Sequence, residues 1–360
     1  MKFLTRHPFF SSLLKLVAYI LVGWNTLFAC LVVAVLLLGA VFTVPPATEH
    51  LGDLEPVYGE AHSFNDLLAI PVTGEIVGDG ATSLASFDAE VTSGYEVKQK
   101  LYEAVDHDEI KGVVLEINSP GGTIYGAHAI ADGVEYYRSK TKRPVFAHIE
   151  GIGASGAYWA AVSADRVVAD YGSDVGSIGV VMGPFKYYNT VLSEQGGLFD
   201  GGVMTQNGIQ SVSITAGKSK DLGDPYRQLT TDEQRQLQQS VNNDYDQFVQ
   251  YVSQRRDITA EVLRNQVGAM IYDNKTAQNL KLIDQSGSRE DVYAALAKAA
   301  KVEGEDYRVV RQATAVSFLA SLLGAVTHAP THSAKSPASL CALTRSPLVH
   351  YGSVTELCGR

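Results

Sequence analysis

Two consecutive stretches of the chain each combine an apolar, strand-like run with a glycine-rich turn and a helix-like segment. The first runs from residues 112–117 through the turn at 118–123 into a helix expected over 124–137. The second runs from 144–149 through the glycine-rich residues 151–159. Apolar strands that alternate with helices at such short intervals are typical of a largely parallel sheet. The pattern therefore predicts an α/β fold.

Ser155 lies in the second turn, within Gly151-Ile-Gly-Ala-Ser-Gly-Ala-Tyr-Trp159, where small neighbours leave its hydroxyl uncovered. A strand is expected before it and a helix after it, from residue 157 to 162. A serine at such a junction lies where the helix dipole can stabilise a developing anion. The same small residues also suit tight packing of a strand against a helix. We interpret Ser155 as the candidate nucleophile.

Gly121 and Gly122 hold the equivalent place in the first unit, after Pro120. Bare backbone N–H groups at a helix N-terminus can form an oxyanion hole, although a type II turn is also compatible with this sequence. Because consecutive units of a parallel sheet put their turns at the same edge, we expect the glycine pair and Ser155 to be neighbours.

The remaining elements extend this domain on both sides. A strand interrupted at the sheet edge by Pro71 is predicted over residues 67–77, a helix over 95–105 and a strand over 166–169. Ser177 lies in a glycine-punctuated loop that follows, where a serine is often part of a turn. Further helices at 259–267 and 288–299, with residues 277–282 between them, close the domain near Lys301.

A long helix begins at Thr230, which forms a capping box with Glu233. Its apolar residues recur at spacings of three and four, which indicates a core face or a subunit interface. They are Leu237, Val241, Tyr245, Phe248 and Val252.

Residues 16–44 carry no charged side chain and exceed the roughly 20 residues that a membrane span requires. We expect a transmembrane anchor there, since the apolar region of a cleaved signal peptide is normally about 7–15 residues long. Residues 27–30 faintly resemble a lipoprotein cleavage box, but Phe28 fits it poorly and the apolar run continues past Cys30, which disfavours lipidation.

Basic residues predict the orientation of this anchor. Lys2, Arg6 and Lys15 precede the span, and the next Lys or Arg is Lys98. Residues 1–15 should therefore face the cytoplasm. In a bacterial inner membrane the rest of the chain would be periplasmic or extracellular, with residues 45–65 as a linker.

The net charge of -10 argues against nucleic acid as the main partner. The three cysteines, Cys30, Cys341 and Cys358, have no paired spacing, which excludes a disulfide framework or a cysteine-type zinc site. Residues 327–360 are rich in Ser, Thr and Pro, and we expect residues 302–360 to form a partly disordered C-terminal extension.

A serine nucleophile needs a general base. His107, His128 and His148 are the histidines of the predicted domain, and spacing alone does not exclude a Ser-His-Asp arrangement. A lysine can act in the same way when burial keeps it neutral near pH 7. Lys218 and Lys220 follow a strand-like segment, where a pair of lysines is most often solvated.

Four motifs in a fixed order, behind a membrane anchor, resemble the signal peptide peptidase SppA family of membrane-bound serine proteases. The likeness covers residues 67–300 and implies a ClpP/crotonase-like α/β fold over 66–301, of the short form with one domain. SohB-type relatives share the same motifs. The motifs are Asn118-Ser-Pro-Gly-Gly, Gly153-Ala-Ser-Gly-Ala-Tyr-Trp, Val175-Gly-Ser-Ile-Gly-Val and Ala216-Gly-Lys-Ser-Lys-Asp.

The resemblance also implies a role for individual residues. Ser155 matches the nucleophile, Lys220 the general base and Ser177 a serine that orients the lysine. The oxyanion hole would come from Gly121, Gly122 and Gly156. Two features depart from the family pattern: the segment between Ser177 and Lys220 is long for a short form, and Lys218 is a second possible base.

Partners and substrates follow from the same resemblance. Family members form ring-shaped homo-oligomers in which neighbouring protomers complete each other's sites, and they act on signal peptides left in the membrane. No metal or cofactor is required. Two other classes stay open: a crotonase-like acyl-CoA enzyme, and a membrane-anchored scaffold that has lost its chemistry, against which the intact Ser155, Lys220 and Ser177 argue.

Overall fold

The computed structural model describes residues 19, 23–24, 51–52, 54–79, 91–185, 187, 214–312 and 348–350. The predicted anchor at 16–44 lies outside this part of the chain, apart from three residues. Among the described residues, no helix is both long enough and apolar enough to cross a membrane. The chain divides into two compact units, Met1–Glu49 and His50–Arg360, and the fold described below belongs to the second.

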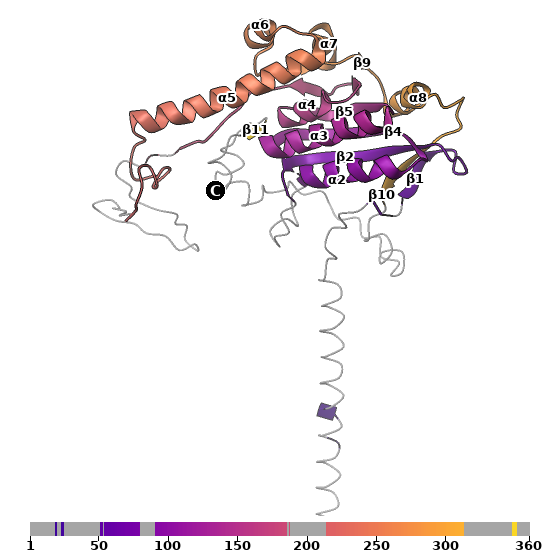
Figure 1. Cartoon of the computed structure of the whole chain (residues 1–360), viewed down its shortest axis with the longest axis horizontal. Helices are drawn as coiled ribbons and strands as arrows, with labels where there is room; N and C mark the ends of the chain where they lie inside the picture. Colours follow the sequence, from indigo (N-terminus) through magenta and orange to yellow (C-terminus); the bar gives the residue numbers. More distant parts are fainter. Residues whose placement is uncertain are drawn as a thin grey trace, which may run out of the picture. The chain divides into compact units, whose positions relative to one another are not determined.

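The second unit is built on one large, mostly parallel sheet (Figure 1). Its main path runs β1-β10-β2-β4-β5-β6-β9, and β2, β4, β5 and β6 are parallel to one another. The predicted α/β fold with a parallel sheet is therefore confirmed. The strands are β1 Leu54–Gly59, β2 Asp66–Val77, β3 Val91–Ser93, β4 Ile110–Thr123, β5 Val145–Ala154, β6 Arg166–Ala169, β7 Asp174–Gly176, β8 Ile271–Asp273, β9 Gln285–Ser286, β10 Arg308–Gln312 and β11 Leu348–His350.

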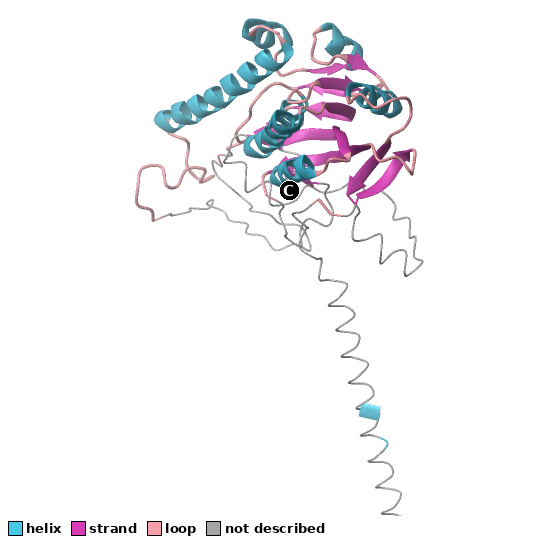
Figure 2. Cartoon of the chain, turned by 45° about the vertical axis from the view of Figure 1, so that its right-hand side comes forward, coloured by secondary structure: helices cyan, strands magenta, loops and turns pink. Residues whose placement is uncertain are grey.

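Helices cover both faces of this sheet (Figure 2). The longest ones begin at side-chain caps: Thr123 caps α3 and Thr230 caps α5. The helical elements are α2 Gly94–Glu103, η2 Ala104–Asp106, α3 Ile124–Thr141, α4 Gly156–Ala161, α5 Thr231–Arg256, α6 Ala260–Val262, the π-helical turn η3 Leu263–Val267, α7 Asn274–Asn279 and α8 Arg289–Ala299.

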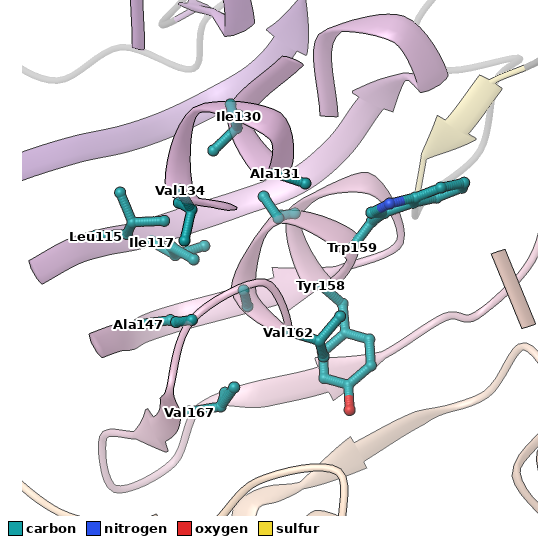
Figure 3. Close-up of a cluster of buried hydrophobic side chains, with 14 of the residues drawn as sticks. Leu115, Ile117, Ile130, Ala131, Val134, Ala147, Tyr158, Trp159, Val162 and Val167 are labelled. Atoms are coloured by element: carbon teal, nitrogen blue, oxygen red, sulfur yellow. The ribbon is translucent and has the colours of Figure 1, made fainter. Parts of the chain in front are cut away.

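The main core lies between the sheet and helices α3 and α4. Leu115 and Ile117 of β4 and Ala147 of β5 belong to one buried cluster with residues of α3 and with Tyr158 and Trp159 of α4 (Figure 3). On the other face, Val114, Phe146 and Val168 form a smaller cluster with Tyr293 and Leu296 of α8. Both faces of the parallel strands are thus buried, as their continuous apolar sequences require.

The strand predicted over 67–77 is β2, but it is an interior strand that continues through Pro71 rather than an edge that Pro71 interrupts. Pro71 pairs with Glu116 of β4 on one side. On the other side, β10 pairs only with Asp66–Leu68 and β3 only with Glu75–Val77. Proline is tolerated because, in the described part of the sheet, no neighbouring strand needs its missing N–H at this position.

The sheet includes strands on both sides of the predicted domain boundaries at 66 and 301. β1 lies in the stretch assigned to the linker, and β10 lies in the stretch assigned to the C-terminal extension. β10 pairs with both β1 and β2, and Arg308 makes an ion pair of 2.6 Å with Asp66. These short strands have few apolar residues, so periodicity did not reveal them; long-range pairing holds them in place.

Candidate active site

Ser155 occupies the sharp turn between β5 and α4. Its backbone has φ 56° and ψ -119°, a region that L-residues rarely adopt and that costs about 1–3 kcal/mol. The side chain is fully buried, and its Oγ has no hydrogen-bond partner within the described part of the chain. Strained backbone and an unsatisfied buried hydroxyl are both unusual in a purely structural position, and they favour a functional role for this serine.

The register of β4 and β5 brings the glycine pair to the same edge of the sheet as Ser155. Ser119 of β4 lies opposite Gly153 of β5, so two residues further along each strand lead to Gly121 and Ser155. Gly121 has φ +101°, and a Cβ atom on Gly122 would lie 2.0 Å from the carbonyl oxygen of Ile76. Only glycine fits this close approach between β4 and β2.

The predicted oxyanion donors differ in their present hydrogen bonds. The N–H of Gly121 donates to Ser119 Oγ at 3.1 Å, so it does not point freely into the site. Gly156 is the first residue of α4, and helix geometry leaves the N–H groups of a first turn without an intrahelical acceptor. Sequence reasoning assigned no role to Ser119, although a serine two residues before a glycine in a turn is a signal for such a bond.

Ser177 lies next to the residue that holds Ser155. The N–H of Ser155 donates to Gly176 O at 2.8 Å, and β7 pairs with β5 so that Gly176 lies opposite Ala154. Ser177 has φ 54°, is almost fully buried, and its own N–H donates to Met270 O at 2.7 Å. The structure therefore brings Ser155 and Ser177 together from segments that follow separate strands.

Lys220 lies in a segment held against the first turn of α5. Its neighbour Asp221 forms an ion pair of 2.7 Å with Arg227, which also contacts Glu233 at 2.8 Å. Hydrogen bonds from Arg227 lower the pKa of both carboxyl groups. Lys218 makes an ion pair of 3.3 Å with Asp232 at the surface. Lys220 is also exposed in the single chain.

The structure does not bring Lys220 beside Ser155 of the same chain. Trp159, one turn after Ser155 on α4, stacks on Phe248 of α5 at a centroid distance of 4.7 Å. From Asp232 to Phe248 the helix rises about 24 Å. Figure 1 shows α5 extending beyond the sheet, with the segment before it at the far end.

Only the C-terminal half of the apolar stripe predicted on α5 is core. Phe248 and Val252 are buried, but Leu237, Val241 and Tyr245 remain partly exposed. The N-terminal half of α5 thus keeps apolar side chains in contact with solvent in the single chain.

The three histidines considered as a base from the sequence are poorly placed for that role. His148 is buried on the α8 face of β5, where Nδ1 lies 2.8 Å from Glu150 and Nε2 lies 3.2 Å from Gly287 O. His107 lies before the amino end of β4, at the opposite end of the strands from Ser155. His128 is exposed on α3 and pairs with Asp132 at 3.3 Å.

Together, the parallel sheet, the buried serine at the start of a helix and the adjoining glycine pair define an α/β domain of the ClpP type. Comparison with protein families agrees: residues 87–168 match the Clp protease family, and residues 137–303 match peptidase family S49. Residues 137–303 thus resemble an S49 peptidase domain, and the predicted resemblance to the SppA family is confirmed.

Three curated relatives are similar to this chain. The protein MJ0651 of Methanocaldococcus jannaschii, named as a protease, is 36% identical over 199 residues, which are 55% of this chain and 59% of the relative. A protein of Enterococcus faecium named for signal peptide peptidase SppA is 27% identical, over 69% of this chain and 67% of the relative. Protease 4 of Haemophilus influenzae is 27% identical, over 62% of this chain and 33% of the relative. The chain thus spans about three fifths of the first of these relatives.

Proposed function

We propose that the protein is a membrane-anchored serine endopeptidase in which Ser155 is the nucleophile and a lysine is the general base. The observation that carries the proposal is the state of Ser155: a fully buried hydroxyl without a hydrogen-bond partner in the described chain, on a strained turn at the start of α4. The match of residues 137–303 to peptidase family S49 supports this proposal.

The proposed reaction is acyl transfer. The base accepts the proton of the Ser155 hydroxyl while Oγ attacks the carbonyl carbon of a peptide bond. The tetrahedral oxyanion then accepts hydrogen bonds from backbone N–H groups of Gly156 and the glycine pair, where Gly121 would first have to release Ser119 Oγ. The base returns its proton to the leaving amine, and water hydrolyses the acyl-enzyme.

Lys220 is the proposed base, supplied by a neighbouring chain of a ring-shaped homo-oligomer. Two features support this arrangement. Lys220 and the N-terminal half of α5 are exposed in the single chain. The Oγ of Ser155 has no hydrogen-bond partner among the described residues of its own chain. A neighbour that covers Leu237 and Val241 would bury apolar surface and exclude water from around Lys220. Ser177 is proposed to orient that lysine, since it lies beside Ser155.

The proposed substrates are short hydrophobic peptides, including signal peptides left in the membrane after preprotein processing. The uncharged residues 16–44 support an anchor in the bacterial inner membrane, and the basic residues before it support a cytoplasmic N-terminus with the domain on the opposite side. The name of the Enterococcus relative supports the same substrate class.

Cleavage of an unstructured apolar peptide by the purified full chain in detergent tests the proposal. The parent protein should cleave the peptide, and Ser155→Ala should abolish cleavage. Equal rates for the two proteins would rule out Ser155 as the nucleophile. Binding of coenzyme A with no peptide cleavage would instead favour an acyl-CoA enzyme of the same fold.

A further inference from the structure

Met270 lies on the side of Ser155 that faces away from the glycine pair. β5 pairs with β4 on one side and with β7 on the other, and β8 pairs with β7 in turn. The glycine pair belongs to β4, whereas Met270 is the residue directly before β8. The turn that carries Ser155 is therefore placed between the two.

Two backbone hydrogen bonds put Met270 in the same row across the sheet as Ser155. The N–H of Ser155 donates to Gly176 O at 2.8 Å, and the N–H of Ser177 donates to Met270 O at 2.7 Å. Neighbouring strands are about 4.8 Å apart, so the backbone of Met270 lies about 10 Å from that of Ser155. An extended peptide bound at Ser155 covers this distance with about three residues.

The side chain of Met270 is not used by the fold. It is 64% exposed, and only the carbonyl group of this residue is needed to hold Ser177. Ala269 and Val181 are exposed as well, and their segments adjoin, because a Cβ atom on Gly179 would lie 2.9 Å from the Cβ of Ala269. A single exposed apolar residue is common on a protein surface. Here three of them border the row that contains the candidate nucleophile, and together we call Val181, Ala269 and Met270 the apolar rim.

The proposed reaction gives this side of the site a distinct task. The base that accepts the proton of Ser155 returns it to the leaving amine, so the base and the leaving amine lie on the same side of the acyl carbon. Ser177, which is proposed to orient the base, lies on the side of the apolar rim, whereas the oxyanion lies on the side of the glycine pair. The part of the peptide that follows the cleaved bond therefore runs past Ser177 towards the rim.

We propose that Met270 determines specificity for the peptide residues that follow the cleaved bond, and that Val181 and Ala269 complete an apolar contact surface for them. The inference rests on the proposed function, because it assumes acyl transfer at Ser155. Methionine is unbranched and flexible, so it adapts to apolar partners of different shape. Such a surface suits a peptidase that acts on varied apolar peptides.

The acyl-enzyme offers a measurement that isolates this side of the site. A short apolar peptide methyl ester acylates Ser155 with loss of methanol, so no amino acid is left beyond the acyl carbon. An added amine can then replace water: its nitrogen bonds to the acyl carbon, the bond from that carbon to Ser155 Oγ breaks, and the proton of the amine passes through the base to Oγ. By microscopic reversibility the amine occupies the place of the leaving residue. The ratio of amide product to acid product therefore reports on the contacts of the amine.

The experiment compares lysinamide with leucinamide as the added amine, on the full chain in detergent. Met270→Glu should raise the ratio for lysinamide relative to leucinamide by about threefold or more, and Met270→Lys should lower it by a similar factor, because an exposed charge pair or a like-charge contact is worth that much. Phe64→Glu is the matched control: Phe64 is 85% exposed and precedes β2, at the opposite end of the parallel strands from Ser155. It should leave the ratio unchanged. Equal ratios in the parent and in both Met270 variants would overturn the proposal.

A second measurement distinguishes the two sides of the cleaved bond. Two methyl esters that differ only in the last residue, leucine or lysine, should keep the same relative kcat/KM in the parent and in Met270→Glu. A changed preference for that residue, without a changed preference for the amine, would assign the rim to the other side of the bond and would also overturn the proposal. If the parent hydrolyses these esters no faster than Ser155→Ala does, the proposed function itself fails, and the inference about Met270 falls with it.

Discussion

The backbone N–H of Ser155 donates a 2.8 Å hydrogen bond to the carbonyl oxygen of Gly176, the residue before Ser177. This bond joins the turn after β5 to the end of β7. Gly176 lies opposite Ile271 of β8, and the next N–H, that of Ser177, donates to Met270 O. The conformation of the candidate nucleophile therefore depends on residues more than one hundred positions later in the chain.

The unsatisfied hydroxyl of Ser155 leads to a prediction about stability. Ser155→Ala should abolish peptide cleavage without lowering the free energy of unfolding, because no hydrogen bond within the described chain is lost. Thermal and denaturant unfolding of the two proteins would measure this.

Ser163 provides a matched control, since it is equally buried but donates from Oγ to Ala160 O at 2.6 Å. Ser163→Ala should destabilise the protein by about 1 kcal/mol. A comparable loss of stability in Ser155→Ala would mean that Ser155 is held by a structural interaction rather than kept ready for a reaction.

If the general base is Lys220 of a neighbouring chain, two inactive variants should complement each other in a mixed oligomer. Ser155→Ala and Lys220→Ala should each be inactive alone. After equal amounts are unfolded and reassembled together, about one quarter of the sites should combine an intact serine with an intact lysine from the next chain. Peptide cleavage by the mixture measures this recovery.

A base from the same chain would leave every site in the mixture defective, and no activity would return. Lys218→Ala serves as the control for the choice of lysine, because Lys218 already pairs with Asp232 at the surface. That variant should keep its activity, and loss of activity in Lys218→Ala but not in Lys220→Ala would transfer the role of base to Lys218.

Arg227 is predicted to position the Lys220 segment, because it joins Asp221 to Glu233 in the first turn of α5. Arg227→Gln should reduce kcat by at least about tenfold, since a misplaced catalytic group commonly costs that much or more. Arg227→Lys should restore part of the activity. Kinetics of both variants should be compared with those of Arg235→Gln, which removes an exposed pair with Asp232. Equal rates in Arg227→Gln and Arg235→Gln would contradict a positioning role.

Sequence reasoning located the parts of the site that are encoded within a few residues. The small residues around Ser155 and the glycine pair after Pro120 are local requirements of the turns, and the parallel arrangement of two β-turn-α units was enough to expect them side by side. The placement of Lys220 could not be predicted in the same way. It depends on how far α5 extends past the core, and the spacing of its apolar residues does not distinguish a core face from an interface.

The strands that sequence reasoning missed are short and depend on distant partners. β10 is held between β1 and β2, and its Arg308 and Arg311 pair with the buried carboxylates of Asp66 and Glu116. Nothing within five residues of sequence indicates those pairings. β11 is still shorter, and its position follows only from the edge that β5 leaves open.

Glu75 provides a prediction about pH. It lies opposite Gly121 in the β2–β4 ladder, and burial raises the pKa of its carboxyl group from 4.5 to about 7. Below pH 4.5 this residue is protonated in both the folded and the unfolded chain. Between pH 4.5 and 7 the unfolded chain releases the proton while the folded chain retains it, so the contribution of Glu75 to stability falls as the pH rises and then levels off above pH 7.

Glu75→Gln removes this titration and should therefore stabilise the protein relative to the parent more at pH 8 than at pH 4. Unfolding midpoints of parent and variant at both pH values measure the difference. The pKa of the Glu150 carboxyl group shifts in the opposite direction to that of Glu75. Burial opposes the charge of Glu150, but hydrogen bonds from His148 and Arg289 outweigh it and lower the pKa to about 2. Glu150→Gln should accordingly destabilise the protein at pH 7 and have less effect as the pH falls from 4.5 towards 2. If Glu75→Gln changes stability equally at pH 4 and pH 8, the carboxyl group beside the glycine pair does not titrate as its burial predicts.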